Sequence, residues 1–86
     1  MRWVVYIVQC ADQTLYTGCT NNIDKRIGQH NSGKGAVYTK HRRPVVVMKI
    51  FEVQNRSEAL KLEYKIKQLS RSDKWKLIRG ELNENF

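Results

Sequence analysis

The spacing of hydrophobic and polar residues changes from strand-like to helix-like along the first third of the chain. Residues 2–10, "RWVVYIVQC", are rich in β-branched and aromatic side chains, which predicts a strand. The polar turn "ADQT" and the returning strand "LYTGCT" then complete a hairpin. In "NNIDKRIGQHNSG", an Asn cap, isoleucines four positions apart and a late glycine predict a short helix.

The remaining pattern predicts one more strand and two helices. A basic loop, residues 33–44, leads into the strand "PVVVMKIFEV", which has the sole proline at its start. The segment "RSEALKLEYKIKQLSR" predicts the longest helix, and "SDKWKLIRG" predicts a short helix ended by Gly80. The order β-β-α-β-α-α predicts an α+β fold, a small three-stranded antiparallel sheet flanked by helices, in a single domain of residues 1–86.

Composition is typical of a folded, reduced protein. Hydrophobic residues make up 41% of the 86 positions and charged residues 28%, which excludes a disordered chain. No apolar run approaches the ~18 residues of a membrane span, and the N-terminus lacks a cleavage pattern. Cys10 and Cys19 are too few for a zinc site. We therefore expect a cytoplasmic protein without membrane contact, with a single disulfide as the alternative.

Positive charge is the strongest global signal. Sixteen Lys and Arg against eight Asp and Glu give a net charge of +8. Five basic and no acidic residues lie between Lys34 and Lys49, and eight basic against three acidic residues lie between Arg56 and Arg79. Such segments favour binding to nucleic acid through its phosphates. The alternative is a set of solvated helix faces that keep the protein soluble.

Helical periodicity places three polar side chains beside apolar ones. On a wheel of about 100° per residue starting at Ala59, Glu63 lies within about 60° of Ile66. A carboxylate on the core side must be paired, hydrogen-bonded or bound to a cation. In the first helix, Arg26 and His30 are four positions apart on the side of the isoleucines. Glu63 pairing with a nearby Lys or Arg, including Arg26, and a helix-end role for His30 are the alternatives.

These residues, taken together, resemble the GIY-YIG nuclease superfamily. "VVY" at residues 4–6 and "YTG" at residues 16–18 are similar to its two half-motifs, and "TNNIDKRIGQHNSGKGAVYTKHRRPV" carries its helix arginine as Arg26. In "SEALKLEYKIKQ", Glu63 matches the metal-binding glutamate of the family. The resemblance covers Trp3 to about Leu69 and is strongest to small stand-alone bacterial members.

Two departures from the superfamily pattern limit what the resemblance implies. Val4 replaces the first motif glycine inside a strand, which should matter little. Cys19 and His30 stand where repair-type nucleases of this superfamily carry a Lys and a Tyr. The roles of that Lys and that Tyr therefore do not carry over to this chain.

The resemblance implies a metal-dependent endonuclease. Glu63 would hold one Mg²⁺ or Mn²⁺, and Arg26 would bind the phosphate. Tyr6 and Tyr16 would position or deprotonate water, with His30 as an alternative base or proton relay. Gly18 would allow close approach of backbone or ligand after Tyr16. The alternative for the two tyrosines is cross-strand contact in a half-buried sheet.

We expect the basic loop to supply affinity. Phosphate contacts are predicted for Lys34, Lys40, Arg42 and Arg43, while Tyr38 either stacks on a base or fills space under the loop. The first hypothesis is an endonuclease acting on DNA, favoured over RNA, including structure-selective cleavage in repair or recombination. The second is a nucleic-acid-binding module of the same fold that is non-catalytic or needs a partner. A protein-interaction adaptor is the third.

Overall fold

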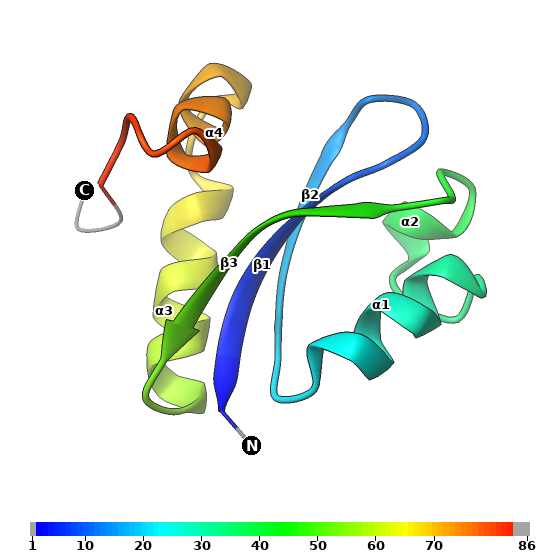
Figure 1. Cartoon of the computed structure of the whole chain (residues 1–86), viewed down its shortest axis with the longest axis horizontal. Helices are drawn as coiled ribbons and strands as arrows, with labels where there is room; N and C mark the ends of the chain where they lie inside the picture. Colours follow the sequence, from blue (N-terminus) through cyan, green and yellow to red (C-terminus); the bar gives the residue numbers. More distant parts are fainter. Residues whose placement is uncertain (1, 84–86) are drawn as a thin grey trace.

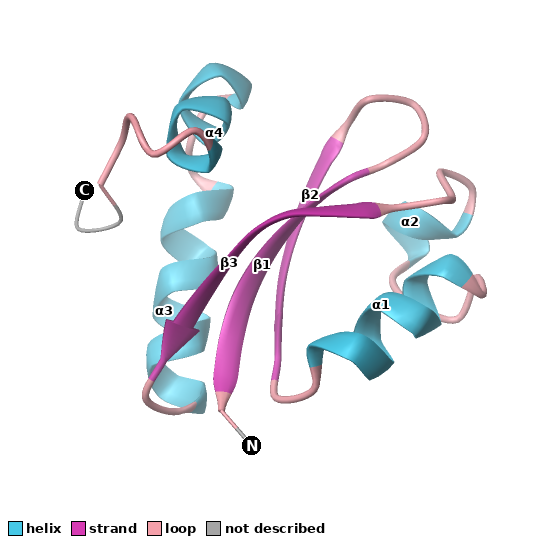
Figure 2. Cartoon of the chain, viewed as in Figure 1, coloured by secondary structure: helices cyan, strands magenta, loops and turns pink. Residues whose placement is uncertain are grey.

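The computed structural model describes residues 2–83, so residues 1 and 84–86 of the predicted single domain lie outside the described residues. Four helices and three strands follow one another in the order β-β-α-α-β-α-α (Figures 1 and 2). Their bounds are β1 Trp3–Gln9, β2 Leu15–Thr20, α1 Ile23–Asn31, α2 Val37–Lys40, β3 Val46–Val53, α3 Arg56–Lys67 and α4 Arg71–Ile78. The predicted α+β class with a three-stranded antiparallel sheet is confirmed.

Strand β1 is the centre of the sheet. The strand order is β2-β1-β3, and β1 pairs antiparallel with both neighbours. Its apolar run is continuous because both of its faces are covered, and every residue from Val4 to Val8 is buried. Strands β2 and β3 are the two edges of the sheet.

The alternating side chains of β1 contact two separate layers of helices. Val5 and Ile7 lie in one core with residues of α3 and α4. Tyr6 and Val8 lie in the other core, with side chains from α1 and from the segment before β3. Figures 1 and 2 show α3 and α1 on different sides of the sheet. Since Cys10 and Cys19 are free thiols in contact with different cores, the alternative of a disulfide between them is not formed.

The main helices begin at side chains that satisfy free backbone N–H groups. The side-chain oxygens of Asn22, Asn55 and Ser70 each accept a hydrogen bond from the backbone N–H three residues later, at the starts of α1, α3 and α4. Gly33 follows α1 with a φ of +84°, where a side chain would be strained. Within residues 2–83, none of the helices has the length and apolar character that crossing a bilayer requires.

Two element boundaries differ from the sequence prediction. The basic segment predicted as a loop contains the one-turn helix α2, whose Thr39 is fully buried. The longest helix ends at Lys67 instead of Arg71, because Ser70 caps the next helix, α4. The observed order is therefore β-β-α-α-β-α-α instead of β-β-α-β-α-α.

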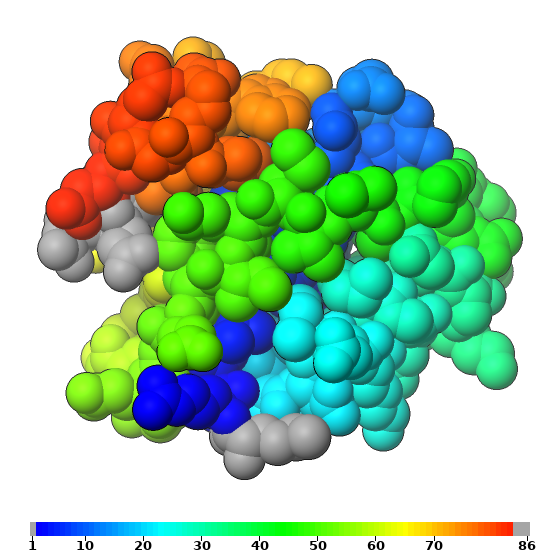
Figure 3. Space-filling model, in the orientation of Figure 1, coloured from blue at the N-terminus to red at the C-terminus, as the bar shows by residue number. Residues whose placement is uncertain are grey.

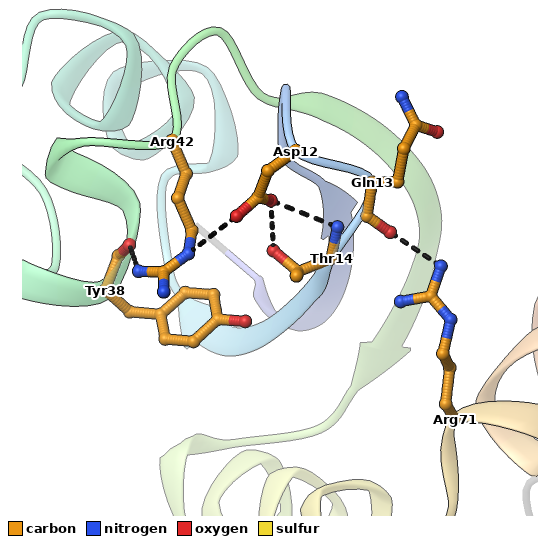
Figure 4. Close-up of polar contacts among 6 residues, drawn as sticks. All are labelled: Asp12, Gln13, Thr14, Tyr38, Arg42 and Arg71. Atoms are coloured by element: carbon orange, nitrogen blue, oxygen red, sulfur yellow. Dashed lines mark hydrogen bonds and ion pairs between the residues drawn. The ribbon is translucent and has the colours of Figure 1, made fainter.

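The turn between β1 and β2 connects the two helical layers. Figure 3 shows it (blue) between α4 (orange) and the green segment that contains α2 and the start of β3. Arg42 Nε donates to Asp12 Oδ2 at 2.9 Å, and Arg71 Nη2 donates to the carbonyl of Gln13 at 2.7 Å (Figure 4). Gln13 has a φ of +72°, which this turn imposes on a residue with a side chain. These contacts hold the hairpin at a fixed angle to both layers.

The position of Gly18 opposite Tyr6 in the β1–β2 register gives a direct test of this fold. A Cβ atom at Gly18 would lie 2.4 Å from the Tyr6 hydroxyl oxygen, so Gly18→Ala should lower the free energy of unfolding by about 1–3 kcal/mol. Gly28→Ala is the matched control, because nothing lies within 4 Å and alanine favours a helix by about 0.5–1 kcal/mol. Urea denaturation measures the free energy of unfolding of both variants. If Gly18→Ala left this free energy unchanged, the Tyr6 ring would not be held against β2.

Candidate active site

A buried hydrogen bond between a tyrosine and a histidine forms the centre of the candidate site. Tyr6 extends from β1 toward α1, and its hydroxyl oxygen lies 2.8 Å from His30 Nε2. The exposed fractions of the two residues are 1% and 0%. His30 lies in the last turn of α1, so the sequence alternative of a helix-end position is also correct, but the imidazole faces the sheet.

The hydrogen bond continues through the imidazole into α2. His30 Nδ1 lies 2.7 Å from Thr39 Oγ1, and Thr39 Oγ1 donates to the carbonyl of Ala36 at 3.0 Å. A threonine hydroxyl has one proton, so Thr39 must accept from Nδ1–H. This leaves Nε2 unprotonated and able to accept from Tyr6 O–H. The direction of the chain is therefore Tyr6 to His30 to Thr39 to Ala36.

Two glycines permit this arrangement. Gly18 on β2 faces the Tyr6 hydroxyl so closely that a Cβ atom at this position would overlap the hydroxyl oxygen. A Cβ atom at Gly35 would lie 2.4 Å from His30 Nδ1, so the loop between α1 and α2 approaches the imidazole as only glycine can. The sequence predicts close approach at Gly18 but gives no signal for Gly35 or Thr39, because both are ordinary residues for a basic loop.

Burial and Arg26 set the electrostatics of the pair. Burial lowers the pKa of His30, and the charge of Arg26 lowers it further, so the imidazole is neutral near pH 7. Burial also raises the pKa of the Tyr6 phenol, while a hydrogen bond and the charge of Arg26 act in the opposite direction. Arg26 is thus the cation next to the tyrosine–histidine pair. Its Nη1 also donates to Gln29 Oε1 at 3.2 Å.

Glu63 reaches the other side of edge strand β2. Burial raises the pKa of Cys19, and the Glu63 carboxylate beside the thiol raises it further by charge and hydrogen bonding. Glu63 Oε2 lies 3.5 Å from Lys67 Nζ, and the exposed fraction of its side chain is 19%. The sequence alternative of a lysine partner for Glu63 is therefore confirmed. Within residues 2–83, no ion pair joins Glu63 to Arg26.

A surface cavity lies between the end of β2 and α1. Cys19 and Arg26 both line it, together with Trp3, Thr20, Asn22, Lys25 and Gln29. Cys19 borders Glu63, and Arg26 borders Tyr6. Arg26 therefore lines the cavity directly, whereas Glu63 borders it only through Cys19. The described residues contain no cluster of three or more His, Cys, Asp or Glu side chains able to hold a metal ion, and the lining of this cavity carries no carboxylate.

Tyr16 belongs to a stack of side chains on the α1 side. Its ring meets the His30 ring edge-on at a centroid distance of 5.4 Å and stacks on Tyr38 at 5.7 Å. The guanidinium carbon of Arg42 lies 4.0 Å from the centroid of the Tyr38 ring, and Arg42 Nη1 donates to the Tyr38 carbonyl (Figure 4). Tyr38 is thus stacked between Tyr16 and Arg42 and remains 38% exposed, so the sequence alternative of a core residue under the loop is not the arrangement observed.

The two arginines of the basic segment have internal partners. Arg42 bonds to Asp12, as described above, while Arg43 donates to the carbonyls of Lys40 at 3.0 Å and Asn31 at 3.5 Å. Lys34 and Lys40 are exposed at the surface. Sequence reasoning treated the four cations alike, because the spacing of charges does not show which of them cap helix ends.

The chain belongs to the GIY-YIG catalytic domain family, which it matches over residues 2–77. It is 58% identical over 79 residues to the UPF0213 protein of Desulfotalea psychrophila, covering 91% of this chain and 72% of the relative. The solution structure of the UPF0213 protein from Bacillus halodurans is similar, with a TM-score of 0.60 at 42% identity over 92% of this chain and 84% of that one. A protein from E. faecalis reaches a TM-score of 0.65 at 35% identity, over 93% and 85% of the two chains.

Family membership confirms the resemblance identified in the sequence. GIY-YIG domains are generally endonucleases that use a divalent metal, so membership implies nuclease-type activity and suggests nucleic-acid binding. The UPF0213 name specifies neither a substrate nor a metal.

The buried histidine predicts a specific loss of stability in acid. Because the pKa of His30 in the folded chain is lowered, the unfolded chain, with a value of about 6.5, takes up the proton first as pH falls. Stability should therefore decrease as pH drops below about 6.5. The His30→Gln variant should lack this acid-dependent step. Its free energy of unfolding at pH 8 should be lower than that of the parent protein by about 1–3 kcal/mol, since Tyr6 and Thr39 lose a partner.

The exposed His41 provides the control. His41→Gln should keep the acid-dependent step of the parent protein, and the imidazole NMR signals of the parent protein report His30 directly. An acid step that survives in His30→Gln, or that disappears in His41→Gln, would contradict the assignment.

Proposed function

We propose that the protein is a metal-dependent endonuclease that hydrolyses phosphodiester bonds in DNA. The observation that carries this proposal is the buried Tyr6–His30 hydrogen bond with the Arg26 guanidinium beside it. A hydrolytic nuclease needs a group that removes a proton from water and a cation that stabilises charge on the phosphoryl oxygens. This pair and Arg26 meet both needs, and family membership supports the reaction class.

The tyrosine–histidine pair would work as a proton relay. An isolated phenol, with a pKa near ~10, is a poor base at neutral pH. In this chain the Tyr6 proton already points at the unprotonated Nε2 of a neutral His30. As Tyr6 takes a proton from the attacking water, it passes its own proton to His30. Neither residue has to carry a full charge before the reaction begins.

Arg26 would both bind the phosphate and uncover Tyr6. The tyrosine is 1% exposed, and Arg26 is one of the groups at its hydroxyl. A planar guanidinium binds phosphoryl oxygens through paired hydrogen bonds. When Arg26 turns toward a phosphate, it leaves the phenol oxygen open to the attacking water. The half-buried Tyr16, on the other strand of the hairpin, would position that water with its hydroxyl group. Its ring is held in place by the edge-on contact with His30.

The residues at the β2 edge fit a hydrated divalent cation. Mg²⁺ keeps several of its waters and is held in many phosphoryl-transfer sites by one or two carboxylates, which suits the single carboxylate of Glu63. When bound, Mg²⁺ or Mn²⁺ would neutralise charge on the leaving oxygen. Lys67 occupies one carboxylate oxygen in this structure and would release it to the cation.

Substrate affinity would come from the positive surface. The net charge of +8 and the exposed Lys34 and Lys40 support phosphate contacts. Arg42, Arg43 and Tyr38 would contribute by holding α2 and Tyr16 in place as well as through their remaining donors. The preference for DNA, a role in structure-selective repair or recombination, and a cytoplasmic location with free thiols are parts of the same proposal.

A non-catalytic or partner-dependent nucleic-acid-binding module is the second candidate. Two observations favour it: Tyr6 is covered, and Glu63 pairs with Lys67. A partner subunit or the nucleic acid itself would then have to rearrange Arg26 and Lys67 before turnover. Cleavage by the isolated chain separates the two candidates.

Replacement of Glu63 tests the endonuclease proposal. Glu63→Gln should lower the divalent-dependent cleavage rate by ~10²-fold or more, because the amide cannot neutralise the cation. The melting temperature should hardly change, since one partly exposed ion pair is worth about 1 kcal/mol or less. Single-turnover cleavage of branched, flapped, single-stranded and duplex DNA measures the effect.

Glu58→Gln is the matched control for this substitution. Glu58 lies on the same helix, pairs with Lys61 at 3.7 Å and is exposed. This variant should cleave at the parent rate. Equal rates for the Glu63 and Glu58 variants would exclude the metal role, and strong destabilisation of Glu63→Gln alone would favour a purely structural one.

A further inference from the structure

The side of α3 next to Glu63 has an unusual surface. Four residues make up this surface, which we call the Glu63 flank: Arg56, Leu60, Tyr64 and Lys67. Leu60 is 44% exposed and Tyr64 is 67% exposed, although both are large and apolar for most of their volume. Single exposed apolar residues are common and need no explanation. Here two of them lie together between two cations.

Helix geometry makes the flank continuous with the candidate site. On the wheel that starts at Ala59, Glu63 lies at about 40° and Arg56 and Lys67 at about 60° and 80°. Leu60 and Tyr64 follow at about 100° and 140°, so the surface runs from the carboxylate outward around the helix. Lys61, at about 200°, lies beyond it.

The two cations of the flank face the same edge strand as Glu63. The positive charges of Lys67 and Arg56 act on Cys19 of β2, so both cations lie on the β2 side of α3. The side chain of Lys67 is 48% exposed, and Arg56 is exposed. A strand of nucleic acid with a phosphate in the Arg26 cavity would therefore pass these cations as it leaves β2.

Tyr64 differs from the other aromatic residues. Tyr6 and Tyr16 belong to the buried cluster, and Tyr38 is already stacked on Tyr16. Among residues 2–83, Tyr64 is the most exposed aromatic side chain. An exposed aromatic ring flanked by cations is the combination that holds single-stranded nucleic acid, because the ring stacks on a base and the cations bind phosphates.

We propose that the Glu63 flank binds an unpaired nucleotide of the substrate strand next to the scissile phosphate. Tyr64 stacks on the base, Leu60 covers its edge, and Arg56 and Lys67 contact the neighbouring phosphates. The substrate class is then nucleic acid with a single-stranded segment at the cleavage point, such as a flap, instead of a continuous duplex. This inference rests on the proposed function only in placing the scissile phosphate at the β2 edge.

Binding measured without a divalent metal tests this inference separately from cleavage. The probe is a single-stranded DNA oligonucleotide containing 2-aminopurine, compared with a blunt duplex of the same sequence, in EDTA. Tyr64→Ala should weaken single-strand binding by about 10-fold and abolish the fluorescence quenching caused by stacking. Tyr64→Phe should retain both, and duplex binding should change less than 2-fold in either variant.

Matched controls are available on other surfaces. Val37 is 87% exposed on α2, so Val37→Ala removes an apolar side chain of similar exposure and should leave binding unchanged. Lys67→Gln should flatten the salt dependence of single-strand binding by about one unit of slope, whereas Lys61→Gln on the other side of α3 should not. Because these residues are exposed, all variants should melt at the parent temperature.

The outcomes separate this inference from the proposed endonuclease activity. If Tyr64→Ala bound and quenched the single strand normally, the inference would be overturned. It would also be overturned if this variant lost as much affinity for the duplex as for the single strand. A flank that instead holds a second copy or another protein would leave DNA binding intact in Tyr64→Ala, with a change in sedimentation. If the parent protein shows Tyr64-dependent single-strand binding and never cleaves, the inference stands and the endonuclease proposal fails.

Discussion

The hydrogen bond between Tyr6 and His30 is the contact on which the rest of the site depends. It joins the central strand to α1 in a place without solvent, where each partner would be costly to bury alone. The requirement for a third partner explains why Thr39 is buried and why α2 folds back over α1. The Tyr6 and His30 rings also need space, which explains why the neighbouring positions 18 and 35 are glycines without side chains. A short hairpin and a single helical turn therefore have little freedom to rearrange.

The same constraint divides the candidate site between the two faces of the sheet. Tyr6 and His30 lie on the α1 side, while Glu63 extends from α3 on the other side. The two groups can meet only at an edge of the sheet, and β2 is that edge. Arg26 and Cys19 line the cavity there. In the proposed function, a phosphate bound at this edge takes its chemistry from the α1 layer and its cation from the α3 layer.

Much of the fold could be predicted because its signals are local. The hairpin, the capped helices and the inward positions of Arg26 and Glu63 follow from periodicities of two and 3.6 residues. The one-turn helix α2 could not be predicted, since four residues give too little periodicity and Thr39 is held by a residue nine positions earlier. The internal roles of Arg42 and Arg43 depend on where the hairpin turn and the end of α1 come to lie in space. No spacing of charges encodes that.

Single-turnover cleavage by Tyr6→Phe is the measurement that tests the account most directly. The ring and its contacts remain, so the free energy of unfolding should fall by only about 1–3 kcal/mol, the cost of leaving His30 Nε2 buried without its donor, while binding to DNA in EDTA stays unchanged. The cleavage rate should fall by ~10²-fold or more, because the group between the water and His30 is gone. A rate equal to that of the parent protein would show that the Tyr6 hydroxyl takes no part in the reaction and that the proposed proton relay is wrong.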